Sequence, residues 1–235
     1  MYPLKSNRNI WKMRIKAIIT GSTGMIGKGL LLECLESPDV ESVLVINRQP
    51  VGLRHEKLTE VIHQDFFDLA TLKEQLTGFN TCYFCLGISA AGLSEDKYHR
   101  ITYRLTVNFA ETVLALNPDI IFCYVSGAGT DSSEKGRIMW ARVKGKTENA
   151  LLARPFKKAY MFRPGFIQPM KGVRSRTRLY NNLYAVLKYL YPVLKGLPAY
   201  VTSSDRLGQA MLKAVLKGYD QSILESRDIN ILASG

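Results

Sequence analysis

The chain has 235 residues, of which 46% are hydrophobic, and its formal net charge is +12 at pH 7. This length and composition support one large α/β domain with a substantial core, and no Pro/Gly/Ser-rich linker divides the sequence. The basic charge is scattered, and no recognisable nucleic-acid-binding module accompanies it, so nucleic acid is disfavoured as a partner. We predict a single domain over 1–235, with 1–13 as a flexible extension.

Short apolar runs alternate with helical patterns from Arg14 onward. We expect strands at 14–20, 42–47, 60–65, 80–87, 119–127 and 158–165. We expect helices at 25–37, 67–76, 96–116, 139–153 and 205–218, with Asp68 as the N-cap of the second and Gly218 ending the closing helix. Strands that alternate with helices in this way predict a doubly wound, mostly parallel Rossmann-type α/β sheet with helices on both faces.

The glycine-rich sequence GSTGMIG lies between the first expected strand and the first expected helix. Gly21 permits the tight turn, Gly24 lets the backbone approach a pyrophosphate, and Gly27 lets the helix pack close to the strand. The helix N-terminus adds unpaired N–H groups and a partial positive charge. In this context the motif predicts a dinucleotide phosphate cradle rather than a bare turn. The cradle consists of Gly21, Ser22, Thr23, Gly24, Met25, Ile26 and Gly27.

The end of the second expected strand indicates which dinucleotide binds. NAD sites usually place an acid there to bond the ribose 2′-hydroxyl, whereas NADP sites use arginine for the 2′-phosphate. Asn47 and Arg48 stand at this point, and no acid lies at the strand tip. Because the planar guanidinium suits phosphate, we favour NADP(H) over NAD(H), with a solvated Arg48 as the alternative.

The cysteines bear on metal binding and location. Cys82 and Cys85 have a C-x-x-C spacing but lie in an apolar run, where their odd separation puts them on opposite faces of a strand. No second pair and no His-x-His cluster completes a metal site, so we predict none. Buried thiols of a cytoplasmic protein are the favoured interpretation, and 1–13 lacks the apolar core of a secretory signal.

Several motifs together resemble the short-chain dehydrogenase/reductase superfamily. They are the glycine pattern at 21–27, Asp65 after the third expected strand, Leu86-Gly87, YVSGAG at 124–129, V-K-G-x-x-E at 143–148 and FRPG at 162–165. The resemblance is to the atypical and extended branch that includes NAD-dependent epimerases and dehydratases, and it runs from about Arg14 to Pro169. It implies a Rossmann fold that binds a nicotinamide dinucleotide and an unidentified small-molecule substrate.

The resemblance also implies where the cofactor lies. Asp65 would contact the adenine, and Leu86 and Gly87 would lie along the adenosine ribose. Pro164 and Gly165 match the segment beside the nicotinamide.

Three residues are candidates for catalysis in this resemblance. Ser126 falls near the catalytic serine, although a shift of one residue would place Gly127 there. Lys144 matches the lysine that holds the nicotinamide ribose and lowers the pKa of a catalytic tyrosine four residues earlier. Trp140 occupies that tyrosine position.

The tryptophan changes the expected chemistry. A phenol can give and take a proton at working pH, whereas an indole N–H is only a donor. Trp140 can therefore orient or stack against a substrate but cannot be the usual acid/base, so another residue or a water must move the proton. The sequence offers further side chains, for each of which packing is the favoured role: Tyr98, His99, Tyr103, Tyr180 and Tyr184.

The region 166–204 is expected to form a small substrate-side or lid segment. Its basic and aromatic stretch at 171–195 is compatible with a pocket for an anionic or lipid-like substrate, with an amphipathic helix on a membrane or partner subunit, or with core packing. Contact of 179–197 with a membrane surface is disfavoured, and a homo-oligomer remains open.

These observations predict an NADP(H)-dependent oxidoreductase that acts on a small carbonyl or alcohol with non-standard proton transfer. One alternative is a catalytically silent dinucleotide-binding sensor or scaffold. Another is a sugar-nucleotide epimerase or dehydratase, which also needs a hydride step and so meets the same proton problem. Trp140 is the residue that best discriminates among the three.

Overall fold

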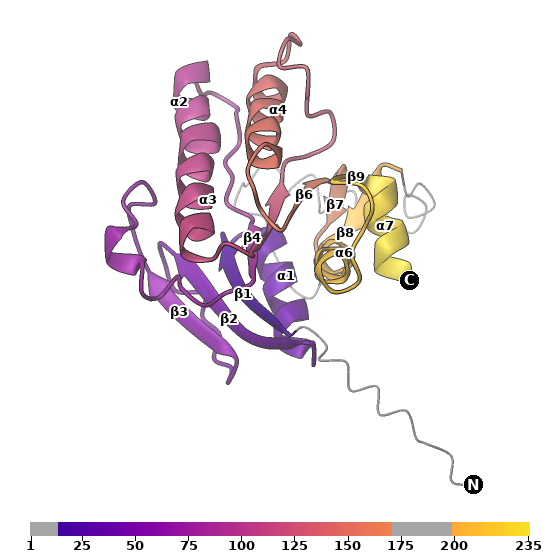
Figure 1. The fold of residues 1–235 in the computed structure, drawn as a ribbon. Coiled ribbons are helices and arrows are strands. Elements are labelled where there is room, and N and C mark those ends of the chain that lie inside the picture. Colours follow the sequence, from indigo (N-terminus) through magenta and orange to yellow (C-terminus); the bar gives the residue numbers. More distant parts are fainter. Residues whose placement is uncertain (1–13, 171–198) are drawn as a thin grey trace, which may run out of the picture.

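The computed structural model describes residues 14–170 and 199–235 (Figure 1). Its centre is a seven-stranded sheet in the order β3-β2-β1-β4-β5-β6-β9, and every neighbouring pair is parallel. The strands are β1 Ile15–Thr20, β2 Val40–Asn47, β3 Leu58–Ile62, β4 Thr81–Phe84, β5 Ile121–Val125, β6 Lys158–Arg163 and β9 Ile223–Glu225. This order confirms the predicted doubly wound Rossmann-type sheet.

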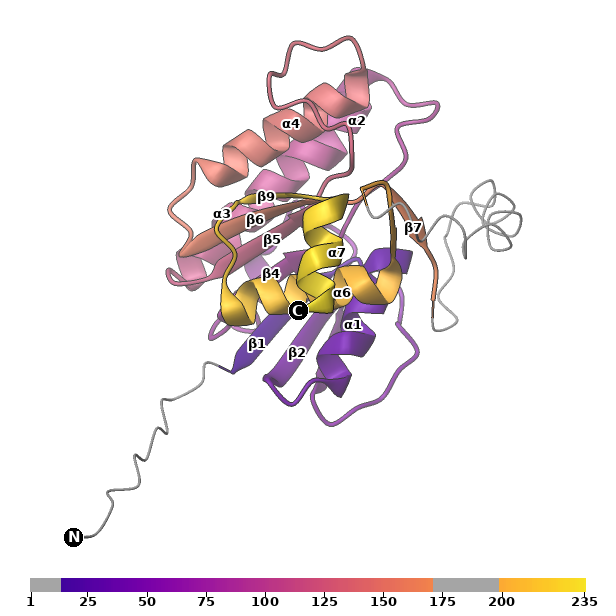
Figure 2. The ribbon, with the colours of Figure 1, turned by 90° about the vertical axis from the view of Figure 1, so that its right-hand side faces the viewer.

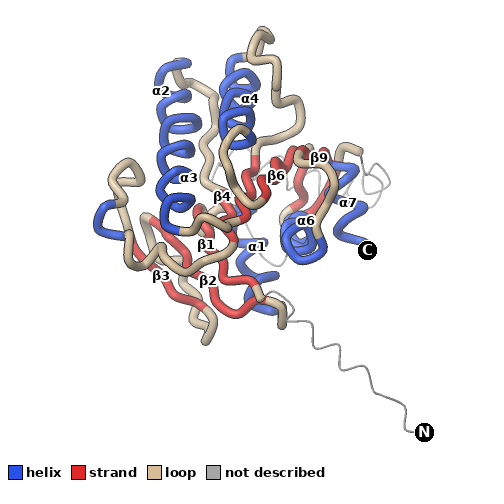
Figure 3. Tube along the Cα trace, viewed as in Figure 1, coloured by secondary structure: helices blue, strands red, loops and turns tan. Residues whose placement is uncertain are grey.

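Helices cover both faces of the sheet (Figures 2 and 3). One face carries α1 Met25–Glu36, α6 Ser204–Lys217 and α7 Ser226–Ser234, and the other carries α3 Leu105–Leu116 and α4 Met139–Leu152. Alternate side chains of each strand serve the two layers, as in β1, where Ile19 faces the first and Ile18 the second. The central strands β4 and β5 are therefore buried along their whole length, as in parallel sheets between two helical layers, whereas the edge strand β3 is partly exposed.

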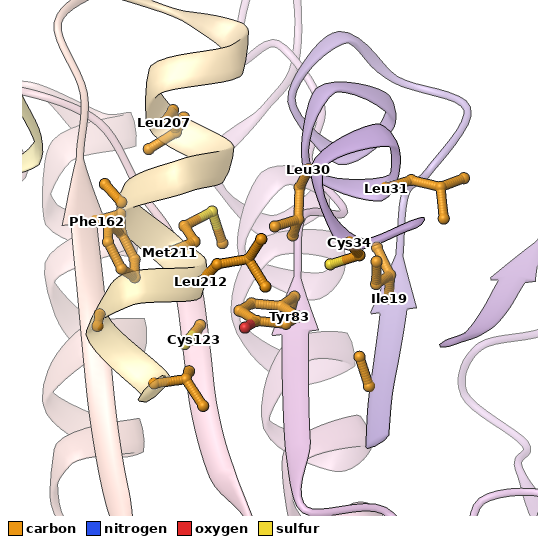
Figure 4. Close-up of a cluster of buried hydrophobic side chains, with 14 of the residues drawn as sticks. Ile19, Leu30, Leu31, Cys34, Tyr83, Cys123, Phe162, Leu207, Met211 and Leu212 are labelled. Carbon is orange, nitrogen blue, oxygen red and sulfur yellow. The ribbon is translucent and has the colours of Figure 1, made fainter. Parts of the chain in front are cut away.

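The core beneath α1 and α6 is closely packed around β1 and β4 (Figure 4). Leu30, Tyr83 and Met211 are fully buried there, together with the thiol of Cys34. Cys82 lies in the cluster on the other face, whereas Cys85 packs against this one, which confirms that their odd spacing separates them. All four cysteines are free thiols.

The predicted helix at 67–76 is wrong, because only a 3-10 turn, η1 Ala70–Leu72, forms there. Leu69, Leu72 and Leu76 are all buried, which accounts for their helical spacing in the sequence. Successive turns give the same spacing: the N–H of Leu72 donates to the Leu69 carbonyl at 3.0 Å, and that of Leu76 to the Leu72 carbonyl at 2.9 Å. Asp68 is not the N-cap, which is Leu69, but its carboxylate accepts from the Ala70 N–H at 2.9 Å at the start of this turn.

The predicted helix at 96–116 contains a π segment. It consists of α2 Glu95–His99, a π-helical turn, η2, over Arg100–Arg104, and then α3. Such π segments often occur where a helix borders a functional site, because they change the direction of the flanking side chains.

The C-terminal region contains elements that the sequence did not reveal. The short strands β7 Phe166–Gln168 and β8 Val201–Ser203 pair in parallel, and β9 and α7 follow α6. Each of these strands has three residues, too few for a period of two to be recognised. The predictions for 1–13 and 171–195 fall largely outside the described residues. Within 14–170 and 199–235, no helix has the length and apolar character needed to cross a membrane.

Candidate dinucleotide-binding and active site

The glycine cradle joins β1 to α1 at the carboxyl edge of the sheet. Gly21 has φ of 70°, and a Cβ built there would lie 2.7 Å from the carbonyl oxygen of Cys85. A Cβ at Gly27 would lie 2.7 Å from the carbonyl carbon of Gly21 and still closer to its oxygen. The turn and the close approach of α1 to β1 therefore require glycine at these two positions.

The N-terminus of α1 opens into a cavity of about 80 Å³, here called the cradle cavity. Gly24 is the N-cap, no side chain caps the helix, and its first turn contains no acidic residue. Gly21, Thr23 and Gly24 line the cavity. A helix N-terminus of this kind suits a pyrophosphate, because its N–H groups and dipole favour negative charge.

Three of the predicted cradle residues have supporting roles. Ser22 is fully buried, and its hydroxyl donates to Asn47 Oδ1 at 2.9 Å. Met25 and Ile26 pack against the core beneath α1. These three residues hold the loop and the helix from the side of the protein interior. Gly21, Thr23 and Gly24 line the cavity.

Arg48 stands directly after β2 with an exposed side chain, and it lines the cradle cavity. The neighbouring carboxylate, Glu60, accepts from Asn47 Nδ2 at 2.8 Å and from the Val51 N–H at 2.8 Å. This acid is therefore used to hold the end of β2, and the cation at the strand tip faces the cavity. That arrangement favours an additional phosphate over a bare ribose hydroxyl.

A second cavity of about 300 Å³ adjoins the first on the side of β3, and we call it the β3-side cavity. Predicted site residues share its wall with apolar side chains; the lining includes Arg48, Asp65, Leu86, Gly87, Phe66, Phe67, Ile101 and Leu105. Asp65 Oδ1 accepts from the Phe67 N–H at 2.9 Å, which shapes the loop after β3. A largely apolar slot of this kind fits a planar base.

A third cavity of about 650 Å³ lies beside α4, and we call it the α4-side cavity. It brings together the predicted residues of the nicotinamide end: Ser126, Trp140, Lys144, Pro164 and Gly165. Gly127 and Tyr98 also line it. Ile88 lines both this cavity and the β3-side cavity, so the two are neighbours.

Lys144 reaches the end of β5 from α4. It is half-buried, and its ammonium donates to the backbone carbonyl of Ser126. Burial lowers the pKa of Lys144 to about 8, although the carboxylate of Glu148, one turn later, opposes the shift. Trp140 and Lys144 are four residues apart on one helix face, and both line the α4-side cavity.

The hydroxyl of Ser126 is engaged inside the protein. It is 2.5 Å from Glu148 Oε1, to which it donates, and 3.2 Å from the carbonyl oxygen of Phe162. Gly127, the next residue, also borders Lys144, since a Cβ built there would lie 3.9 Å from Lys144 Nζ. A catalytic role for Ser126 stays a prediction, and what the structure describes is its backbone carbonyl against Lys144.

A buried ion pair supports this wall of the site. Glu148 is fully buried and Arg163 is 9% exposed. Arg163 Nε lies 3.1 Å from each carboxylate oxygen of Glu148, and its Nη1 reaches Glu225 at 3.2 Å. The sequence motifs V-K-G-x-x-E and FRPG contain both partners, but spacing along the chain gave no sign that they meet.

Tyr98 is the site residue that the sequence could not single out. It reaches the α4-side cavity from α2 and is 2% exposed. Burial raises the pKa of its phenol, although a hydrogen bond from Thr102 opposes the shift. His99 and Tyr103 stack on each other with ring centroids 4.7 Å apart and line none of the three cavities. Tyr180 and Tyr184 lie outside the described residues.

Metal ligands do not cluster in the part of the chain that the structure describes, where no group of three or more His, Cys, Asp or Glu side chains could hold an ion. The site is built instead from glycines, one arginine, one lysine and apolar walls. These features fit a nicotinamide dinucleotide, which is polyanionic at its centre and planar at both ends.

The sequence profile of the NAD dependent epimerase/dehydratase family matches residues 17–136, more than half of the chain. The chain belongs to this family. The match covers the cradle, β2 with Arg48, and the strands up to the loop after β5. For this epimerase/dehydratase family member, family and geometry together support a nicotinamide dinucleotide as cofactor.

Solved structures with this fold include the Bordetella bronchiseptica enzyme WbmF in complex with NAD+, which superposes with a TM-score of 0.66 at 12% identity. The comparison covers 94% of this chain and 78% of that one. At this identity the likeness concerns the fold alone.

Curated fungal relatives correct the predicted location. "Protein FMP52, mitochondrial" of Debaryomyces hansenii is 26% identical, over 86% of each chain. The Saccharomyces cerevisiae protein of the same printed name is 25% identical, over 92% of this chain and 95% of its own. The prediction of a cytoplasmic location is therefore wrong, because both relatives are named as mitochondrial proteins. Free thiols do not distinguish one reducing compartment from another.

Proposed function

We propose that this protein is an NADP(H)-dependent oxidoreductase that acts on a small carbonyl or alcohol substrate. The observation that carries the proposal is the set of three neighbouring cavities, two of which are lined by Arg48 and the third by Lys144. The cradle would hold the pyrophosphate, Arg48 the 2′-phosphate and Lys144 the nicotinamide ribose. The cofactor, when bound, supplies or accepts the hydride. The chain's own residues bind it, orient it and handle the proton.

Removing the Arg48 guanidinium should change the choice of cofactor. We expect Arg48→Ala to raise the Kd for NADPH by about 30-fold, the loss of a charge-assisted phosphate contact of about 2 kcal/mol, and to leave the Kd for NADH nearly unchanged. Fluorescence titration of the two dinucleotides measures both constants. Lys16→Ala is the matched control, because Lys16 is paired with Glu41 at the opposite end of the sheet's strands. Equal binding of the two cofactors by the wild type would contradict the assignment.

Turnover should be visible as oxidation of NADPH in the presence of carbonyl probes such as 9,10-phenanthrenequinone and aromatic aldehydes. We expect wild-type activity and a loss of at least about 100-fold in Lys144→Ala, because that change removes both the ribose contact and a buried proton source. A wild type that binds NADPH but stays silent, with activity appearing in Trp140→Tyr, would favour a sensor or scaffold instead.

A sugar-nucleotide epimerase or dehydratase is the second candidate, and the family description favours it. Both reactions transfer a hydride to and from the same bound cofactor, so they leave no net NADPH consumption. Incubation of the protein with UDP-sugars, followed by chromatography of the products, separates this candidate from a reductase.

The names of the fungal relatives also support a proposal on location. We infer that the protein acts in mitochondria, where FMP52 of Debaryomyces hansenii and Saccharomyces cerevisiae is placed by name. Fractionation of cells that express the full chain with a C-terminal tag tests this inference.

A further inference from the structure

We propose that Lys144 itself delivers the proton to the substrate oxygen, in the position where the resembling enzymes use a tyrosine. This inference rests on the proposed oxidoreductase function. Lys144 would then both contact the ribose and donate the proton. Position 140 of α4 carries an indole and not a phenol, so no tyrosine can act as the acid there.

The other exchangeable protons on the cavity wall are unsuited to the task, including that of Ser89, since a serine hydroxyl does not ionise near neutral pH. The Ser126 hydroxyl donates its hydrogen bond to Glu148 and lies against the Phe162 carbonyl. Gly127, which adjoins Lys144, has no side chain. The indole of Trp140 can donate a hydrogen bond but cannot transfer its proton near neutral pH. Lys144 and Tyr98 are the titratable side chains left among the described residues that line this cavity.

Lys144 is better placed than Tyr98 for this role. Tyr98 is 2% exposed, and burial raises the pKa of its phenol, so that it releases its proton reluctantly. The Lys144 ammonium lies beside Gly127, which contributes no side chain to the cavity wall. One of its three N–H groups donates to the Ser126 carbonyl, and an ammonium has two more to offer.

The groups around Lys144 make it a suitable acid. Burial lowers its pKa to about 8, which is close to the range in which general acids work best. Glu148, from the same helix, raises the pKa, but Arg163 from β6 neutralises that carboxylate. The β5 strand presents a backbone carbonyl, and α2 presents the neutral phenol of Tyr98.

In the reduction of a carbonyl group, the hydride and the proton come from different donors. The carbonyl carbon gains a hydride from the dihydronicotinamide, which leaves as the oxidised dinucleotide, and the C=O π electron pair moves to the oxygen. That oxygen forms a bond to a proton of the Lys144 ammonium, whose N–H bond breaks. The neutral amine then takes a proton from water, so that the lysine returns to its starting state.

Trp140 provides a readout that does not depend on activity. The chain has two tryptophans, and a Trp11→Phe background leaves Trp140 as the only emitter, one helical turn from Lys144. We expect its fluorescence in the cofactor-free protein to titrate between pH 7 and 9.5 with a midpoint near 8. The transition should vanish in both Lys144→Met and Lys144→Arg and persist in Tyr98→Phe. A transition that survives Lys144→Met overturns the proposal.

Lys144→Arg separates proton delivery from ribose binding. Arginine keeps the positive charge, but its pKa lies above 12, so it cannot act as the acid. We expect Kd for NADPH to change by less than about threefold, while kcat with 9,10-phenanthrenequinone falls by at least about 100-fold. We also expect wild-type kcat to decline as pH rises through the lysine pKa, because reduction requires the protonated form.

Two outcomes separate the proton-delivery role of Lys144 from the proposed oxidoreductase function. If Lys144→Arg retains kcat within about tenfold of the wild type, the lysine only binds the ribose, and the proposal fails while the oxidoreductase function stands. If the wild type binds NADPH and shows the titration but reduces no probe, the proposed function fails, and with it the proton-delivery role.

Discussion

Replacing Glu148 with alanine is expected to lower the free energy of unfolding by about 3–5 kcal/mol, because the change leaves the buried guanidinium of Arg163 with only the half-exposed carboxylate of Glu225. Glu148 is fully buried, and both its oxygens receive hydrogen bonds from Arg163. The Ser126 hydroxyl, buried beside it, would lose its acceptor as well. Urea denaturation followed by far-UV circular dichroism measures the loss.

Two further variants control this experiment. Glu111 of α3 forms an ion pair with Arg154, but its side chain is 58% exposed, so Glu111→Ala should cost no more than about 1 kcal/mol. Glu148→Gln keeps an acceptor for Ser126, but it removes the charge and one of the two oxygens that accept from Arg163. Because Glu148 raises the pKa of Lys144, this variant should shift the Trp140 titration to lower pH. If Glu148→Ala costs as little as Glu111→Ala, the pair does not hold the wall of the site.

Adding one methyl group to the cradle, in Gly27→Ala, is expected to weaken NADPH binding by at least about 100-fold and to destabilise the fold by about 1–3 kcal/mol. The new Cβ would meet the backbone of Gly21 and lie 2.9 Å from the Ser22 nitrogen. These are backbone atoms of the turn itself, so the turn and the start of α1 must move apart. The N–H groups that would hold the pyrophosphate then lose their arrangement.

Gly29→Ala in the same helix separates the two effects. Its Cβ would lie 2.9 Å from the carbonyl oxygen of Ser204, where α1 packs against the start of α6, away from the cradle. We expect this variant to lose stability to a similar degree while it keeps its Kd for NADPH within about threefold of the wild type. Thermal unfolding and dinucleotide titration of both variants give the comparison. Equal Kd values for Gly27→Ala and Gly29→Ala would show that the cradle does not bind the cofactor.

Local patterns predicted most of the sheet, because each strand is a short apolar run buried between helices. The helix at 67–76 failed for an instructive reason. Its buried leucines have helical spacing, but turns can reproduce that spacing, and periodicity alone does not distinguish them. The strands β7, β8 and β9 were missed because three residues carry no period, and their pairing depends on partners elsewhere in the chain.

The candidate site also contains features that the sequence predicted and features that it did not. The cradle glycines were predicted from one strand–turn–helix unit and Arg48 from its place at the end of the next strand, so both predictions depend on residues that are adjacent in the chain. The direction of the Ser126 hydroxyl could not be predicted, since it is set by Glu148, 22 residues later. Tyr98 was indistinguishable from its neighbours until α2 placed it on the cavity wall.

The sequence by itself determined the Rossmann-type fold, the glycine-rich turn between β1 and α1 and the presence of an indole at position 140. These depend on local steric and hydrophobic patterns and on residue identity. Only the tertiary structure decided that Glu148 pairs with Arg163, that Ser126 meets Lys144 through its backbone carbonyl and not its hydroxyl, and that burial lowers the lysine pKa. Burial and charge pairing arise from elements distant in the chain, so no local pattern records them.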